Sequence, residues 1–131
     1  MNVLVTGAAG FISSAVVRDL AARPEVAVIA VDGLTYAANR KTVEALKRQP
    51  RVRFEKADIR DGGAMAALFA AHAPDGVVHL AAETHVDRSI DAPVVFGETN
   101  VMGTLTLLET VRAYWDGLST TSRATFRFVH V

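Results

Sequence analysis

A glycine turn between a short apolar run and a helical pattern constrains the fold more than any other feature of this chain. The run Val3–Val5 is continuously apolar and is followed by Thr6-Gly7-Ala8-Ala9-Gly10, as expected of a strand buried on both faces of a parallel sheet. From Phe11 to Ala22 the apolar residues recur at a helical spacing, at Ile12, Ala15, Val16 and Leu20. We therefore predict a strand, a tight turn and a helix whose free N–H groups can hold an anion.

The rest of the chain repeats this alternation of strand and helix. Further strands are predicted at 26–31, 52–55, 76–80 and 127–131, and further helices at 40–48, 61–71 (with Asp61 as N-cap) and 93–115. Such alternation predicts the α/β class, a Rossmann-type doubly wound parallel sheet in the strand order 3-2-1-4-5. We expect residues 1–131 to form one domain, truncated after the fifth strand and without a substrate domain.

Charge and composition exclude several classes of function. Fourteen basic residues balance fourteen acidic ones, so no net field favours nucleic acid or a membrane surface. There is no cysteine and the four histidines are scattered, so we predict no disulfide and no metal site. The start of the chain resembles no signal peptide. We expect a cytoplasmic protein without a membrane or nucleic-acid partner.

Two acidic residues follow predicted strands. Asp32 lies about 20 residues after Gly10, where a carboxylate can accept from the ribose hydroxyls of a dinucleotide and repel a 2′-phosphate. It therefore favours NAD over NADP, although a solvated turn aspartate before Gly33 is the alternative. Asp58 follows the third strand, where it either contacts the adenine or caps a helix.

The segment after the fourth strand combines small and polar residues. Ala81 and Ala82 leave room for a cofactor against the backbone, and a polar cluster runs from Glu83 to Ser89. We expect this cluster to face the crevice at the strand ends. The alternative is a solvated loop with a helix N-cap at Ser89 or Asp91.

Together these residues resemble the extended short-chain dehydrogenase/reductase family, and within it the dTDP-glucose 4,6-dehydratases. The resemblance covers the whole chain but only the first part of such an enzyme. It rests on four segments: Thr6 to Ile12, Asp32 with 34–37 and Asn39, Leu80 to Ile90, and Glu98 to Thr104.

The resemblance implies an enzyme that converts dTDP-glucose to a 4-keto-6-deoxy product through bound NAD. The implied NAD-binding residues are Gly7, Gly10, Phe11, Ile12, Asp32, Gly33, Leu34, Thr35, Asp58, Ile59, Leu80, Ala81, Ala82, Glu83 and Thr99. Thr84, His85 and Arg88 are the implied substrate-binding residues. The family also implies a homodimer formed through the helix that begins near Pro93, where Val101, Leu105, Leu108, Val111 and Trp115 share one face.

The chain departs from the family pattern in two respects. Ser13 replaces the third glycine of the turn, and we expect it to loosen the helix packing and weaken the pyrophosphate site. The family's Thr-Asp-Glu group and its Tyr-x-x-x-Lys pair do not occur in residues 1–131, so we predict no catalytic residue within them. Three hypotheses stay open: the cofactor-binding part of a dehydratase, a dinucleotide-binding module without turnover, or a related enzyme such as an epimerase or one that acts on UDP-glucose.

Overall fold

The computed structural model describes residues 1–35 and 38–131. Tyr36 and Ala37, which belong to a segment that carries the family resemblance, lie outside the described residues. The strands are β1 (Asn2–Thr6), β2 (Ala27–Asp32), β3 (Val52–Lys56), β4 (Gly76–His79) and β5 (Arg127–His130). The helices are α1 (Phe11–Ala21), α2 (Arg40–Lys47), α3 (Gly62–His72), α4 (Val86–Asp91), α5 (Pro93–Phe96), the π-helix η1 (Gly97–Gly103), α6 (Thr104–Asp116) and α7 (Thr120–Thr125).

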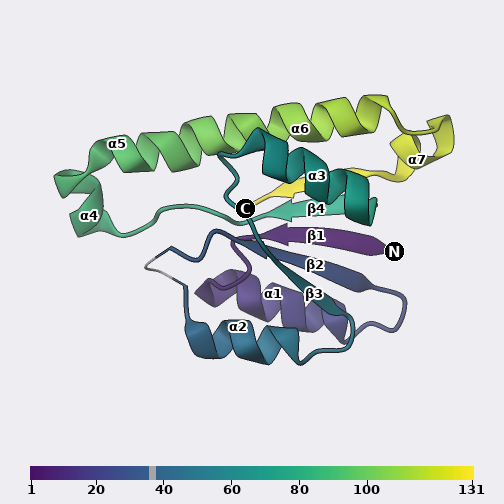
Figure 1. The fold of residues 1–131 in the computed structure, drawn as a ribbon, viewed down its shortest axis with the longest axis horizontal. Coiled ribbons are helices and arrows are strands. Elements are labelled where there is room, and N and C mark those ends of the chain that lie inside the picture. The colour runs from purple at the N-terminus through teal and green to yellow at the C-terminus, as the bar shows by residue number, and fades with distance from the viewer. Residues whose placement is uncertain (36–37) are drawn as a thin grey trace.

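The five strands form one sheet in the order β3-β2-β1-β4-β5, and every neighbouring pair is parallel. The register places Val5 between Ala30 of β2 and Val78 of β4. The predicted fold class and strand order are confirmed. Because all strands run the same way, the loops that follow them gather at one edge of the sheet (Figure 1).

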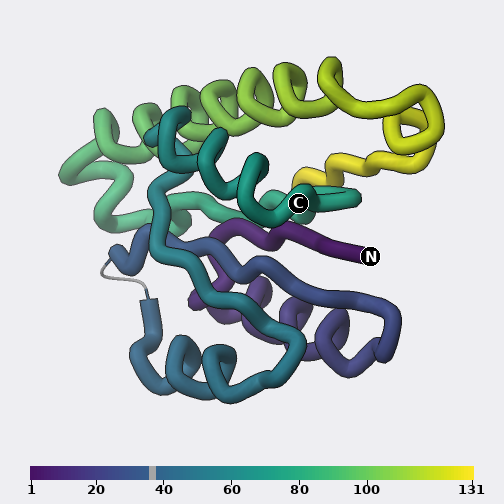
Figure 2. The backbone as a smooth tube through the Cα atoms, turned by 45° about the vertical axis from the view of Figure 1, so that its right-hand side comes forward, coloured from purple at the N-terminus to yellow at the C-terminus, as the bar shows by residue number. Residues whose placement is uncertain are grey.

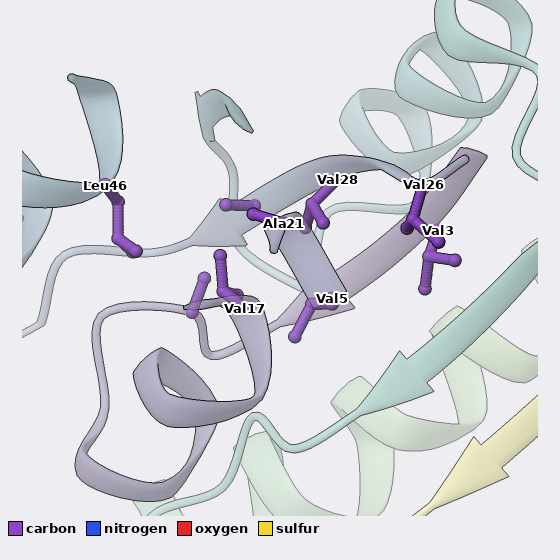
Figure 3. Close-up of a cluster of buried hydrophobic side chains, with 9 residues drawn as sticks. Val3, Val5, Val17, Ala21, Val26, Val28 and Leu46 are labelled. Carbon is purple, nitrogen blue, oxygen red and sulfur yellow. The ribbon is translucent and has the colours of Figure 1, made fainter. Parts of the chain in front are cut away.

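Helices cover both faces of the sheet, α1 and α2 one face and α3 and α6 the other (Figures 1 and 2). Alternate residues of β1 supply the two cores. Val3 and Val5 pack with Val17 of α1 and Leu46 of α2 (Figure 3), whereas Leu4 joins the cluster formed with α3 and α6. This burial on both sides explains the unbroken apolar run at the start of the chain.

Small residues form the buried face of α1. Ser13, Ser14, Val17 and Ala21 are buried, whereas Ile12 is exposed. Small residues, serines included, allow a helix to lie close to a sheet, and of the apolar residues that gave the helical spacing Leu20 packs against this core. The side chain of Ile12 is left to line the cleft at the strand ends.

The predicted long helix from Pro93 to Trp115 is instead three consecutive elements, α5, η1 and α6. Leu107 and Val111 are the buried residues of α6. Val101, Leu105, Leu108 and Trp115 are exposed, so Val111 lies on a different face from the four residues with which it was grouped. These four exposed residues form an apolar stripe along η1 and α6.

The sequence reading missed two short helices, α4 and α7. The predicted alternative of a helix N-cap at Ser89 or Asp91 is wrong, because α4 begins after His85 and contains both residues. Asp61 is the N-cap of α3, as predicted, and its side chain accepts from Ala64 N. Within the described residues, no helix is long and apolar enough to cross a membrane.

Candidate dinucleotide site

A cleft of about 730 Å³ opens at the carboxyl ends of the strands. Every site residue predicted from the sequence lines it except Leu34: Gly7, Gly10, Phe11, Ile12, Asp32, Gly33, Thr35, Asp58, Ile59, Leu80, Ala81, Ala82, Glu83, Thr84, His85, Arg88 and Thr99. Ser13, which was expected to affect the pyrophosphate site, also lines the cleft, and the lining residues that the sequence did not predict are Val31, Ala38, Ala57, Arg60, Val95 and Val131. Residues from all five strand ends therefore meet in one cleft.

The turn after β1 is held in a conformation that only glycine adopts readily. Gly7 has φ +68°, and a Cβ there would lie 2.8 Å from the Cα of Ala81. Both the backbone conformation and the close approach to the end of β4 therefore require glycine. The turn is closed by a hydrogen bond from Gly10 N to Gly7 O of 2.9 Å.

This turn presents the N-terminus of α1 to the cleft. The first N–H groups of a helix have no partner inside it, and no side chain of the described residues caps α1. The side chain of Phe11 is 95% exposed, and Phe11 and Ile12 line the cleft. Free N–H groups and the positive end of the helix dipole form a site for an anion such as a phosphate.

Asp32 connects the end of β2 to the glycine turn. One carboxylate oxygen accepts from Ala9 N at 2.8 Å and the other accepts from Leu34 N at 2.7 Å. Each oxygen keeps acceptor capacity for a further donor in the cleft. Leu34 has φ +54° and bonds Asp32 through its backbone, which explains why its side chain does not line the cleft.

Asp58 is paired with Arg60, a residue that the sequence reading overlooked. The Arg60 side chain donates to the Asp58 carboxylate at 2.7 Å, and Arg60 N donates to it at 2.9 Å. Hydrogen bonding from Arg60 lowers the pKa of the Asp58 carboxyl. Glu98 lies 3.6 Å from the same guanidinium. Asp58 does not cap α3, so that alternative is wrong; its position two residues before an arginine was the signal for this pair.

The loop after β4 is fixed by the side chain of Asn100 on η1. Asn100 Oδ1 accepts from Glu83 N at 2.8 Å, and Asn100 Nδ2 donates to Glu83 O at 2.9 Å. This two-point contact holds the loop backbone against η1. The Glu83 side chain is buried, whereas Thr84, His85 and Arg88 are exposed along the cleft. The described residues contain no group of side chains that could hold a metal ion.

Beneath the cleft, His79 joins β1, β4 and α6. Its Nδ1 lies 2.7 Å from Thr6 Oγ1, and its Nε2 lies 3.0 Å from Thr104 Oγ1. Burial, together with nearby His130, lowers the pKa of His79 to about 4. His79 is therefore a neutral structural residue.

A parallel sheet of this order, with a glycine turn and an acidic residue at the ends of its two central strands, defines the class of Rossmann-type domains. A model of the family described as GDP-mannose 4,6 dehydratase matches residues 4–131. The chain belongs to this family.

Individual relatives are dehydratases and epimerases of nucleotide sugars. The chain is 52% identical to dTDP-glucose 4,6-dehydratase 1 of Escherichia coli (strain K12) over 131 residues, which are 100% of this chain and 36% of that protein. A structure of dTDP-glucose 4,6-dehydratase from Streptomyces venezuelae with NAD bound is 48% identical, with a TM-score of 0.80, over 87% of this chain and 36% of that one. UDP-glucose-4-epimerase from Stenotrophomonas maltophila, with bound NAD, is 33% identical, with a TM-score of 0.80, over 99% of this chain and 36% of that one. The chain thus spans about a third of the length of these relatives.

Proposed function

We propose that this chain is the NAD-binding part of a dTDP-glucose 4,6-dehydratase. The observation that carries the proposal is the meeting, in one cleft, of the uncapped N-terminus of α1 and the carboxylate of Asp32. An adenine dinucleotide needs both an anion site and a ribose acceptor, at this separation along the chain. The identity with the Escherichia coli enzyme supports the particular substrate.

Each wall of the cleft suits one part of NAD. The N–H groups of Phe11 and Ile12 would hold the pyrophosphate, and Asp32 the adenosine ribose, with Gly33, Leu34 and Thr35 around it. Asp58 and Ile59 would flank the adenine. The remaining predicted residues would lie along the nicotinamide half: Leu80, Ala81, Ala82, Glu83 and Thr99. Thr84, His85 and Arg88 are placed where a sugar nucleotide would approach the nicotinamide.

The Asp58–Arg60 pair limits what Asp58 can contribute to adenine binding. Arg60 occupies both oxygens of the Asp58 carboxylate, so an adenine amine would have to share that carboxylate with a guanidinium. Asp32 has no such competitor in the described residues. We therefore assign most of the adenosine recognition to Asp32.

Bound NAD would supply the acceptor, and later the donor, of the hydride in this reaction. The chain's own contribution is to bind and orient that group. Residues 1–131 contain no Tyr-x-x-x-Lys pair and no lysine after Lys56, so proton transfer to and from the sugar would depend on residues outside this range. We expect residues 1–131 alone to bind NAD without turnover.

Mass spectrometry of the product tests the proposed reaction. The complete protein containing these residues, supplied with NAD and dTDP-glucose, should release a nucleotide sugar lighter by one water. A product of unchanged mass but altered configuration would instead indicate an epimerase, the second candidate, which the epimerase structure at a TM-score of 0.80 favours. If neither dTDP-glucose nor UDP-glucose gave a product, both the dehydratase and the epimerase proposals would be contradicted.

We also propose that the protein is a homodimer and is cytoplasmic. The dimer would bury the exposed apolar stripe of Val101, Leu105, Leu108 and Trp115 on η1 and α6. Fusion of the protein to a fluorescent reporter, followed by cell fractionation, tests the location.

A further inference from the structure

Ser13 stands at the cleft in a position where the family turn has glycine. It is the third residue of α1, it is only 4% exposed, and it lines the cleft. The sequence alone suggested that a side chain here would weaken the pyrophosphate site. The helix nevertheless begins at Phe11 and runs unbroken past Ser13, so the serine is accommodated.

The hydroxyl of Ser13 is available to a ligand. In residues 1–35 and 38–131 it has no hydrogen-bond partner, whereas the neighbouring hydroxyl of Ser14 donates to Phe11 O at 3.0 Å. Every fully enclosed side-chain nitrogen or oxygen of the described residues does have a partner. The unpartnered hydroxyl of Ser13 therefore reaches the cleft that the residue lines.

Gly10 shows where this hydroxyl lies. A Cβ built on Gly10 would be 3.5 Å from Ser13 Oγ and 3.1 Å from Gly7 O. The lack of a side chain at Gly10 is what lets a pyrophosphate approach the turn. Ser13 Oγ thus borders the space that Gly10 leaves open, beside the first free N–H groups of α1.

We propose that the Ser13 hydroxyl donates a hydrogen bond to a pyrophosphate oxygen of the bound dinucleotide, adding a side-chain donor to the backbone N–H groups. The proposal rests on the proposed NAD-binding function. Ser13 would then strengthen dinucleotide binding instead of weakening it, because a hydrogen bond from a hydroxyl to a charged phosphate is stronger than one between neutral groups.

The test compares three ligands by calorimetry: NAD and ADP, which contain a pyrophosphate, and adenosine, which does not. Ser13→Ala should lower the affinities for NAD and ADP about tenfold and leave the affinity for adenosine unchanged. Ser13→Gly should weaken them as well, although it restores the family residue. The matched control Ser14→Ala should change none of the three affinities, since the Ser14 hydroxyl is already bonded to the backbone. Urea unfolding without ligand verifies that each variant folds.

The outcomes separate this inference from the proposed function. If Ser13→Ala keeps its NAD affinity, or if Ser13→Gly binds NAD more tightly, the inference is overturned while NAD binding stands. An equal loss for adenosine and ADP would also overturn it, since adenosine has no pyrophosphate. If the unsubstituted protein binds neither NAD nor ADP, the proposed function fails, and the inference fails with it.

Discussion

Thr6 Oγ1 and His79 Nδ1 lie 2.7 Å apart and join the end of β1 to the end of β4. Thr6 Oγ1 also accepts from Leu80 N and Ala81 N, both at 3.2 Å. Because the Thr6 oxygen already accepts two hydrogen bonds, the Thr6 hydroxyl donates a hydrogen bond to His79 Nδ1. The neutral His79 ring therefore carries its proton on Nε2, which donates to Thr104 Oγ1. This network fixes the backbone that Gly7 packs against.

Substitution of Thr6 by valine should destabilise the fold. Thr6→Val keeps the shape but leaves the N–H groups of Leu80 and Ala81 without their acceptor, which should lower the free energy of unfolding by about 3 kcal/mol. Urea unfolding followed by circular dichroism measures the change. Thr120→Val, at an exposed position, is the control and should cost less than about 0.5 kcal/mol. Equal losses for the two variants would argue against the network.

The low pKa of His79 makes the stability depend on pH. The folded state keeps His79 neutral down to a pKa of about 4, whereas the unfolded chain takes up a proton near pH 6.5. Between these values the unfolded state binds more protons, so stability is full above about pH 6.5 and falls as the pH drops towards 4, by up to about 3 kcal/mol. Glu55 and Asp58, whose pKa values are lowered, add a loss in the same direction at lower pH.

A variant separates the histidine from the carboxylates. His79→Gln should flatten the dependence of unfolding free energy on pH between 6.5 and 4, although its stability at pH 7 will be lower. Urea titrations of both proteins at a series of pH values give the two slopes. Identical slopes would show that His79 does not titrate in this window.

Asp32 should govern the choice between NAD and NADP. Asp32→Asn removes the charge that, in the proposed site, would accept from the ribose and repel a 2′-phosphate, so NADH affinity should fall about tenfold while the preference over NADPH shrinks. Fluorescence titration with both reduced dinucleotides measures the ratio. Asp19→Asn, a change on the solvent side of α1 in an exposed pair with Arg23, should alter neither affinity. If Asp32→Asn keeps the preference for NADH over NADPH, Asp32 does not determine the choice of dinucleotide.

The apolar stripe should drive self-association. Leu105 and Leu108 are 49% and 42% exposed, and contiguous exposed apolar surface often marks a protein–protein contact. We expect sedimentation velocity to show dimers or larger species. Leu105→Lys should shift the protein towards monomer, whereas Ala113→Lys, an exposed change on the same helix, should not. A monodisperse monomer at high concentration would contradict the expectation.

The sequence predicted the sheet and the position of the cleft because both follow from local patterns. Apolar runs that end at glycine or aspartate mark strand ends, and parallel strands bring those ends together. Phe11, Asp32 and Ala81, from three separate segments, line one cleft as expected.

Features that depend on tertiary packing were not predictable in this way. The buried serines of α1 are polar by type but small enough for a close helix–sheet contact, so hydropathy alone does not identify them as buried. Val111 shares α6 with Leu105, Leu108 and Trp115, but it packs into the core beside Leu107, and only tertiary packing decides which edge of the apolar face is buried. Asn100 acts through the backbone of Glu83, 17 residues earlier in the chain, and no periodicity reports such a pair.

A crystal structure of the protein with NAD would test the proposed cofactor site. We expect the pyrophosphate over the N-terminus of α1, in contact with the N–H groups of Phe11 and Ile12, and the adenosine ribose hydroxyls on the carboxylate of Asp32. NAD bound elsewhere on the protein, or a cleft that stays empty at saturating NAD, would contradict it.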